Sequence, residues 1–212
     1  MTKVILVRHG QSDANVVKMF AGVYDSHLTP LGHAQAECVA RAISEQYHVD
    51  AVYASDLQRA NVTGLRIAEA CGLPLQVDIG LRECYMGEWE GLTFADAEKN
   101  FYELFWEWRT DIGNSRCPGG EKPGDAGDRM YDTIRRIVDR HPGETVVIAT
   151  HSVAIRALEC RITKNRDYNE MKNVPYVQNA SITVMEWDGD DVRYTMIGDE
   201  AHLGDLSSTK FP

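Results

Sequence analysis

The chain has 212 residues, 43% of them hydrophobic, and its 32 acidic and 22 basic residues give a formal net charge of −10. This length can bury a substantial core, so we expect residues 1–212 to form a single domain, with at most a lid-like insertion. Surfaces that bind nucleic acid or anionic membranes need clustered Lys and Arg, so the acidic balance argues against both partners. An anionic ligand would need a local basic pocket.

The cysteines and the N-terminus indicate the compartment. The five cysteines are odd in number, widely spaced and without a CxxC pair, so neither a disulfide framework nor a structural zinc site is indicated. The apolar run at residues 4–7 is too short for a signal peptide, and no stretch approaches the length of a membrane span. We therefore expect a soluble cytoplasmic protein.

Strand-like and helix-like segments alternate along the first half of the chain. Thr29 and Pro30 are suited to the cap and the first position of one helix, and Gly72 with Pro74 would end the next. Strands are predicted at residues 4–7, 50–55 and 73–78, and helices at residues 28–47, 57–72 and 93–110. Gly64, within the second helix, should weaken it slightly.

The second half begins with residues 114–128, which are rich in Gly and Pro. This loop is too long for a plain connector, so it is interpreted as a rim or lid. Beyond it, helices are predicted at residues 130–143 and 152–162, a strand at 144–150, and a hairpin of strands at 181–187 and 192–198. The pattern predicts an α/β three-layer sandwich, with a mostly parallel central sheet, helices on both faces and an antiparallel addition near the C-terminus.

Two of the predicted strands end on a histidine. The strand at residues 4–7 runs into Arg8 and His9, and the strand at 144–150 runs into His151. Ligands of open α/β sheets bind outside the carboxyl ends of the strands. A lone histidine there is more often a hydrogen-bonded loop residue, but the recurrence at two strand ends favours a functional site.

Two arginines complete this constellation. Arg8 adjoins the first histidine, and Arg59 lies one turn into the helix that follows the strand at residues 50–55. A guanidinium presents a planar fork of donors that matches phosphate oxygens, so these residues predict a phosphoryl-binding pocket. Gly10 and the loop around Gly22 can bring backbone amides close to the same ligand.

Several motifs along nearly the whole chain resemble those of the histidine phosphatase superfamily, specifically its phosphoglycerate mutase-like branch. They are, in order, LVRHGQSDAN, FAGVYDSHLTPLGHAQA, YASDLQRA, LREC followed by GEWEG, PGGE, THSVAIRAL and NASITVMEWDG. The resemblance implies a central sheet with helices on both sides. It also implies that His9 is the nucleophile that becomes phosphohistidine, that Arg8, Arg59 and His151 bind the phosphate, and that Glu83 is the proton donor. Gln11 and Asn15 would line the same pocket.

Phosphoryl transfer to a histidine requires side chains of these types, independently of the resemblance. A neutral imidazole attacks phosphorus near pH 7 without a metal, so no metal or other cofactor is expected. Arg8, Arg59 and a charged His151 would stabilise the transferring group. Glu83 would protonate the leaving oxygen, whereas Glu88 and Glu90 flank Trp89 in a turn, where structural roles are more ordinary.

The sequence departs from the family pattern at two positions beside the pocket. Gln11 follows the RHG triplet, where many relatives have Glu, which lowers the negative charge near the phosphate. Ser152 follows His151, where the pattern has Gly. Two alternatives follow: the Ser152 hydroxyl contributes a hydrogen bond to substrate, or the loop is shifted.

We therefore predict a phosphatase that hydrolyses small phosphate monoesters, with a small phosphorylated metabolite as its partner. The alternative is a cofactor-dependent phosphoglycerate mutase. A mutase must hold a second charged end of its substrate, yet residues 87–110 carry only Lys99 and Arg109 as basic residues. A third, less favoured hypothesis is a non-catalytic phosphate sensor. Substrate specificity is assigned to the loop at residues 114–128 and the aromatic helix before it, and the oligomeric state is open.

Overall fold

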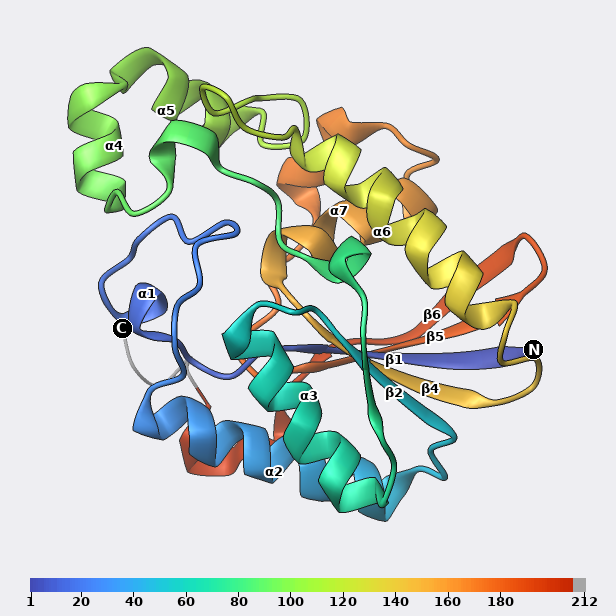
Figure 1. Cartoon of the computed structure of the whole chain (residues 1–212). Coiled ribbons are helices and arrows are strands. Elements are labelled where there is room, and N and C mark those ends of the chain that lie inside the picture. The colour runs from blue at the N-terminus through green and yellow to red at the C-terminus, as the bar shows by residue number, and fades with distance from the viewer. Residues whose placement is uncertain (208–212) are drawn as a thin grey trace.

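The protein, as a computed structural model that describes residues 1–207, is built on a six-stranded sheet in the order β3-β2-β4-β1-β5-β6 (Figure 1). The strands are β1 (Thr2–Arg8), β2 (Ala51–Ala54), β3 (Leu75–Val77), β4 (Thr145–Thr150), β5 (Ile182–Asp188) and β6 (Asp191–Asp199). Strands β1 to β4 are parallel to one another. Strand β5 pairs antiparallel with β1, and β6 pairs antiparallel with β5. The mostly parallel sheet and the C-terminal hairpin confirm the predicted fold class.

Helices cover both faces of the sheet. They are α1 (Asp13–Val16), α2 (Pro30–Gln46), α3 (Gln58–Cys71), α4 (Phe94–Asn100), α5 (Tyr102–Thr110), α6 (Pro123–Val138) and α7 (Ser152–Thr163). Figure 1 shows α2 and α3 together on one side of the sheet and α6 and α7 on the other, with α4 and α5 apart from both layers at the upper left. No helix within residues 1–207 combines the length and the apolar character that crossing a membrane requires.

The sequence signals at the helix ends act as predicted. The Thr29 hydroxyl accepts a hydrogen bond from the Gly32 amide at 3.0 Å and so caps α2, whose first residue is Pro30. Gly72 ends α3 in the left-handed conformation, with φ of 67°.

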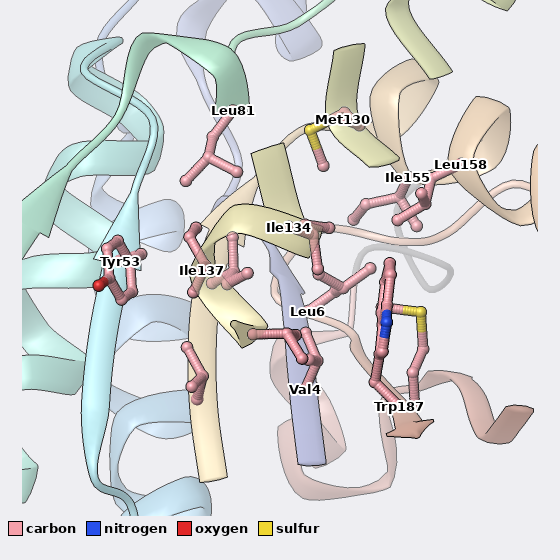
Figure 2. Packing of buried hydrophobic residues seen from close by; sticks show 14 of the residues in the cluster. Val4, Leu6, Tyr53, Leu81, Met130, Ile134, Ile137, Ile155, Leu158 and Trp187 are labelled. Carbon is pink, nitrogen blue, oxygen red and sulfur yellow. The ribbon is translucent and has the colours of Figure 1, made fainter. Parts of the chain in front are cut away.

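Two of the apolar clusters of the core are separated by the sheet, and a third gathers around Phe20, Trp89 and Trp108. Because side chains alternate along a strand, Val4 and Leu6 of β1 face α6 and α7, while Ile5 and Val7 face α2 and α3. Figure 2 shows Val4 and Leu6 near Ile134 of α6 and Trp187 of β5. All four β1 side chains are fully buried, which fixes the direction in which the strand delivers the residues at its end.

The structure corrects three predicted elements. A short helix, α1, follows β1 where a loop was expected, and Ser12 caps it. The single aromatic helix at residues 93–110 is two helices, because Phe101 has non-helical dihedral angles of −134° and 45°. The predicted loop at residues 114–128 ends at Lys122, since Pro123 occupies the first position of α6 and residues 123–128 form its first turns.

Candidate active site

A cavity of about 250 Å³ lies at the carboxyl end of β1. Arg8, His9, Arg59 and Glu83 are among the polar residues that line it. Its walls are largely apolar and come from Met19, Phe20, Met86, Phe94, Trp108 and Val153. The aromatic segment, to which substrate specificity was assigned, contributes Phe94, Trp108 and Arg109 to the lining, whereas residues 114–122 do not line the cavity.

His9 is held directly beyond the end of β1. Its backbone amide donates to the Thr150 carbonyl at 3.0 Å, which ties it to the end of the adjacent parallel strand β4. Its Nδ1 lies 2.7 Å from the Gly10 carbonyl. Because a carbonyl oxygen only accepts, Nδ1 carries the proton and Nε2 presents its lone pair. His9 is thus fixed in the tautomer that makes Nε2 the nucleophilic atom.

Arg59 lies against that nitrogen. The side chain is only 2% exposed, and its Nε–H donates to His9 Nε2 at 3.3 Å. Its two terminal nitrogens donate to the loop at residues 22–26, at the Gly22 and Tyr24 carbonyls and the Ser26 hydroxyl. Arg59 therefore orients the histidine and holds the loop that lines the cavity.

Several buried polar atoms around His9 have no hydrogen-bond partner among residues 1–207. They are Arg8 Nε, both ring nitrogens of His151 and the Ser152 hydroxyl. The His151 ring is fully buried, with its centroid 5.2 Å from that of His9. Buried polar groups are normally paired, so their convergence indicates a site shaped for an oxygen-rich ligand. Arg8 is anchored through Nη1, which donates to the Val177 carbonyl at 2.7 Å.

Burial and the two arginines set the protonation of the histidines. Burial, and then the charges of Arg59 and Arg8, lower the pKa of His9 well below its usual value of 6.5. The pKa of His151 is lowered in the same direction, by burial and then by Arg59. Both imidazoles are therefore neutral at pH 7. The expectation of a charged His151 does not hold for the ligand-free site, because burial disfavours the charged ring and the neighbouring Arg59 guanidinium repels a second cation.

Arg8 remains a cation. Burial lowers its pKa to about 10, while the Glu83 carboxylate acts in the opposite direction. At neutral pH the pocket thus holds two guanidinium ions beside two neutral imidazoles, an arrangement that attracts a phosphate dianion and leaves the nucleophile unprotonated.

Glu83 lies in the same cavity and is 8% exposed. Its carboxylate accepts hydrogen bonds from the Val153 and Ala154 amides in the first turn of α7, at 3.1 and 2.9 Å, and from the Cys84 amide at 2.8 Å. These bonds orient it toward the helix that begins after His151. Glu88 is exposed, and the Glu90 carboxylate binds the Val23 and Met86 amides, so neither competitor lines the cavity.

The predicted substrate-binding residues divide into two groups. Asn15, Gly22 and Ser152 line the cavity. Gln11 does not, because its side-chain carbonyl accepts a hydrogen bond from the Thr29 hydroxyl at 2.8 Å, at the start of α2. The prediction for Gln11 as a pocket residue is therefore wrong, and its role is to join the loop after β1 to α2.

Sequence reasoning also missed residues of the site. Asn179 donates through Nδ2 to the His9 carbonyl and to the Asn15 side-chain oxygen, each at 3.1 Å, and so positions both. The motif NASITVMEWDG contains Asn179 and was the available signal. Tyr176 and Arg109 line the cavity as well, and no motif marked Tyr176.

Within residues 1–207, no cluster of three or more His, Cys, Asp or Glu side chains is arranged to hold a metal ion. The positive charge at the site comes from the guanidinium groups.

Comparison with known families agrees with this geometry. The sequence profile described as "Histidine phosphatase superfamily (branch 1)" matches residues 4–200. The chain belongs to this superfamily. Among its relatives, phosphoglycerate mutase-like protein 4 of Arabidopsis thaliana is 34% identical over 95% of this chain and 86% of its own. The metal-independent phosphoserine phosphatase of the same plant is 31% identical over 88% of this chain and 81% of its own.

A solved member of the superfamily has the same fold. The mycobacterial glucosyl-3-phosphoglycerate phosphatase in complex with VO₃ superposes with a TM-score of 0.86 and 28% identity, covering 93% of this chain and 99% of that one. The three-layer α/β architecture is thus that of a histidine phosphatase.

Proposed function

We propose that this histidine phosphatase hydrolyses small phosphate monoesters through a phosphohistidine formed at Nε2 of His9. The observation that carries the proposal is the state of His9, with Nδ1 donating to Gly10 and Nε2 facing Arg59 at 3.3 Å. The residue roles below rest on this geometry and on the positions of the family motifs.

In the first step, His9 Nε2 attacks phosphorus and forms the P–N bond while the P–O bond to the leaving group breaks. Phosphoryl transfer spreads charge over the equatorial oxygens, so the protein contributes mainly positioning and positive charge. Arg8 and Arg59 supply that charge, and the unpartnered nitrogens of His151 and the Ser152 hydroxyl are available to donate to the oxygens.

Proton transfer is assigned to Glu83. In its protonated form it gives a proton to the leaving alkoxide. The resulting carboxylate then takes a proton from the water that attacks phosphohistidine, and phosphate and free His9 are released. The same group serves both half-reactions, so protons balance over the cycle.

Hydrolysis is favoured over phosphoglycerate mutation because the cavity is open at its rim. Arg109 is exposed and Tyr176 is 57% exposed, so water can reach a phosphorylated His9. Of the two basic residues considered as mutase anchors, Arg109 lines the cavity and Lys99 does not. The sensor hypothesis is disfavoured, because the nucleophile is present and correctly held.

The deciding experiment measures release of free phosphate and interconversion of 2- and 3-phosphoglycerate side by side, with bisphosphoglycerate added to prime the enzyme. We expect phosphate release to dominate. Isomerisation that exceeds hydrolysis by orders of magnitude would replace this proposal with the mutase. Hydrolysis is also expected to survive excess EDTA, since the arginines carry the charge that a metal would supply.

We further propose that the chain works as one domain in the cytoplasm on a small phosphorylated metabolite. Two observations support this. All described strands belong to one sheet, and all five cysteines are free thiols, as is usual in a reducing compartment.

A further inference from the structure

The backbone of the nucleophile is held by a tight turn over residues 178–181, just before β5. The last amide of this turn donates to its first carbonyl at 3.1 Å, which closes it. The Ala180 amide donates to the carbonyls of Arg8 and His9, at 3.0 and 3.2 Å. The His9 carbonyl also accepts from Asn179 Nδ2 at 3.1 Å. The position of His9 therefore depends on the conformation of this turn.

Ala180 has a backbone conformation that alanine rarely adopts. Its φ is 56°, in the left-handed region, where the Cβ of an L-residue crowds the following carbonyl. It occupies the third position of the turn, where a positive φ usually calls for Gly. Such a conformation persists only where surrounding contacts hold it, and residues of this kind gather at functional sites. Ala180 is fully buried, so those contacts come from the protein itself.

The contact that holds the Ala180 carbonyl comes from the C-terminal part of the chain. His202 Nε2 lies 3.0 Å from this carbonyl oxygen. Because a carbonyl oxygen only accepts, Nε2 carries the proton and donates the hydrogen bond. Burial lowers the pKa of His202 below its usual value of 6.5, so the ring is neutral at pH 7. Its other nitrogen, Nδ1, is buried and has no hydrogen-bond partner among residues 1–207, so the one directed bond of this ring is to the turn.

The segment that carries His202 is itself anchored. Ala201–Leu206 forms a short 3₁₀ segment that packs on α2 and is coloured red in Figure 1. Gln35 Nε2 of α2 donates to the Leu206 carbonyl at 2.8 Å. The Leu203 side chain is 3% exposed and belongs to the apolar cluster between α2, α3 and the sheet. The imidazole of His202 is therefore presented to the turn from a fixed base.

We propose that His202 is a positioning residue for the nucleophile. Its hydrogen bond holds Ala180 in the left-handed conformation, and this keeps the Ala180 amide directed at the carbonyls of Arg8 and His9. The imidazole of His9 is thereby kept in place for attack on phosphorus. This inference rests on the proposed phosphatase function and adds to it a residue that does not line the cavity of His9.

The first test is His202→Phe, which keeps a planar ring but removes the N–H donor. We expect kcat for 4-nitrophenyl phosphate to fall about five- to tenfold, the scale of one lost hydrogen bond, while KM changes by less than about twofold. Leu203→Ala is the matched control, because it destabilises the same segment and leaves the bond to the turn in place. Well below its melting temperature it should keep the wild-type kcat. A normal kcat in His202→Phe, or an equal fall in Leu203→Ala, overturns the proposal.

A second variant, Ala180→Gly, distinguishes a hold on the turn from any other role of His202. Glycine adopts the left-handed region without steric cost, so the turn no longer needs the imidazole to hold it. In the Ala180→Gly background, His202→Phe should therefore lower kcat by no more than about twofold. A loss of kcat as large as that measured with Ala180 present would show that His202 does not act through this turn.

Hydrogen exchange tests the same hold without turnover. Relative to the amide of Ile5, in the fully buried part of β1, the Ala180 amide should exchange about tenfold faster in His202→Phe than in the wild type. Equal relative exchange rates overturn the proposal. If the wild type releases no phosphate from any ester, including 4-nitrophenyl phosphate, the proposed function fails. The hold of His202 on the backbone of His9 still stands in that case if the Ala180 amide exchanges faster in the variant, and it fails if the rates are equal.

Discussion

The Nε–H group of Arg59 lies 3.3 Å from Nε2 of His9, the ring nitrogen that is left unprotonated by the bond from Nδ1 to Gly10. Burial is the main reason that the pKa of His9 is low; the charge of Arg59 lowers it further, and the Arg59 hydrogen bond keeps the ring oriented. A phosphoryl group that reaches Nε2 takes the place of the Arg59 Nε–H at this lone pair and lies beside the guanidinium.

Replacing His9 by Ala should remove turnover but not all phosphate binding. We expect kcat to fall by at least about 10³-fold, since the attacking atom is gone. Arg8 and Arg59 remain, so inorganic phosphate should still raise the melting temperature. Acid-labile phosphate trapped on the wild type and absent from the variant is the direct measurement. Wild-type-like rates in His9→Ala would refute covalent catalysis at this residue.

The Glu83→Gln variant distinguishes a role of Glu83 as proton donor from a purely structural role. The variant should lose far more activity on alkyl phosphates than on aryl phosphates, whose leaving groups need little protonation. Its amide oxygen can still accept from Cys84 and Ala154, but the new NH₂ group faces the Val153 amide, another donor. We therefore also expect a loss of stability of about 1 kcal/mol. Equal rate losses on both substrate types would mean that Glu83 acts only as a structural cap.

The buried histidines should make stability fall as the solution becomes acidic. In the folded protein the pKa values of His9 and His151 lie well below 6.5. Below pH 6.5 the unfolded chain therefore binds protons that the folded chain does not, so the free energy of unfolding decreases with falling pH. The slope is about 1.4 kcal/mol per pH unit for each histidine, from pH 6.5 down to its folded-state pKa.

Urea titrations at pH 7.0 and 5.5 measure this effect. His151→Asn should reduce the loss of stability between the two pH values, whereas His33→Asn, at an exposed position of α2, should not change it. An identical pH dependence in the wild type and His151→Asn contradicts the assignment of a neutral buried imidazole.

Gly64→Ala should destabilise the protein although Ala favours helices. A Cβ at position 64 would lie 2.7 Å from the Cβ of Ala54 and 3.3 Å from that of Ala149, where α3 packs on the sheet. The overlap is expected to cost about 1–3 kcal/mol, more than the roughly 1 kcal/mol gained in helix propensity. Adding Ala54→Gly removes the methyl group that clashes, so the double variant should be more stable than the sum of the two single effects. If the stability effects of the two single variants add exactly, the methyl group of Ala54 is not the cause of the instability.

The parts of the site that could be predicted from the sequence are those marked by local patterns, namely strand ends and short motifs. Apolar runs ending on His9 and His151 predicted two parallel strands with aligned carboxyl ends, and the structure pairs these strands directly. Glu83, Asn15 and Ser152 were predicted from motifs and lie in the cavity. Their roles stay predictions, because position alone does not report proton transfer.

Other features could not be predicted because they depend on contacts between distant segments. Gln11 is adjacent to the pocket in sequence, but a hydrogen bond to Thr29 turns its side chain elsewhere. The burial of Arg156 likewise depends on distant contacts, because Arg156 Nη2 donates to the Met171 carbonyl and its guanidinium stacks on Tyr176. The helix break at Phe101 was also not predicted, since the helical pattern continues on both sides of it.

The placement of β1 between β4 and β5 has a consequence for the order of folding. β1 pairs along both edges with strands that begin at Thr145 and Ile182, far later in the sequence. Until those are synthesised, a strand with four consecutive apolar residues has no partner from them in the sheet and needs protection from other chains. Domains with such long-range pairings fold slowly, because distant segments must meet before the contacts can form. His9 thus acquires Thr150 and Asn179 as neighbours only after both of these distant segments have been synthesised, so a chain truncated before Asn179 has no assembled site with which to act on phosphate esters.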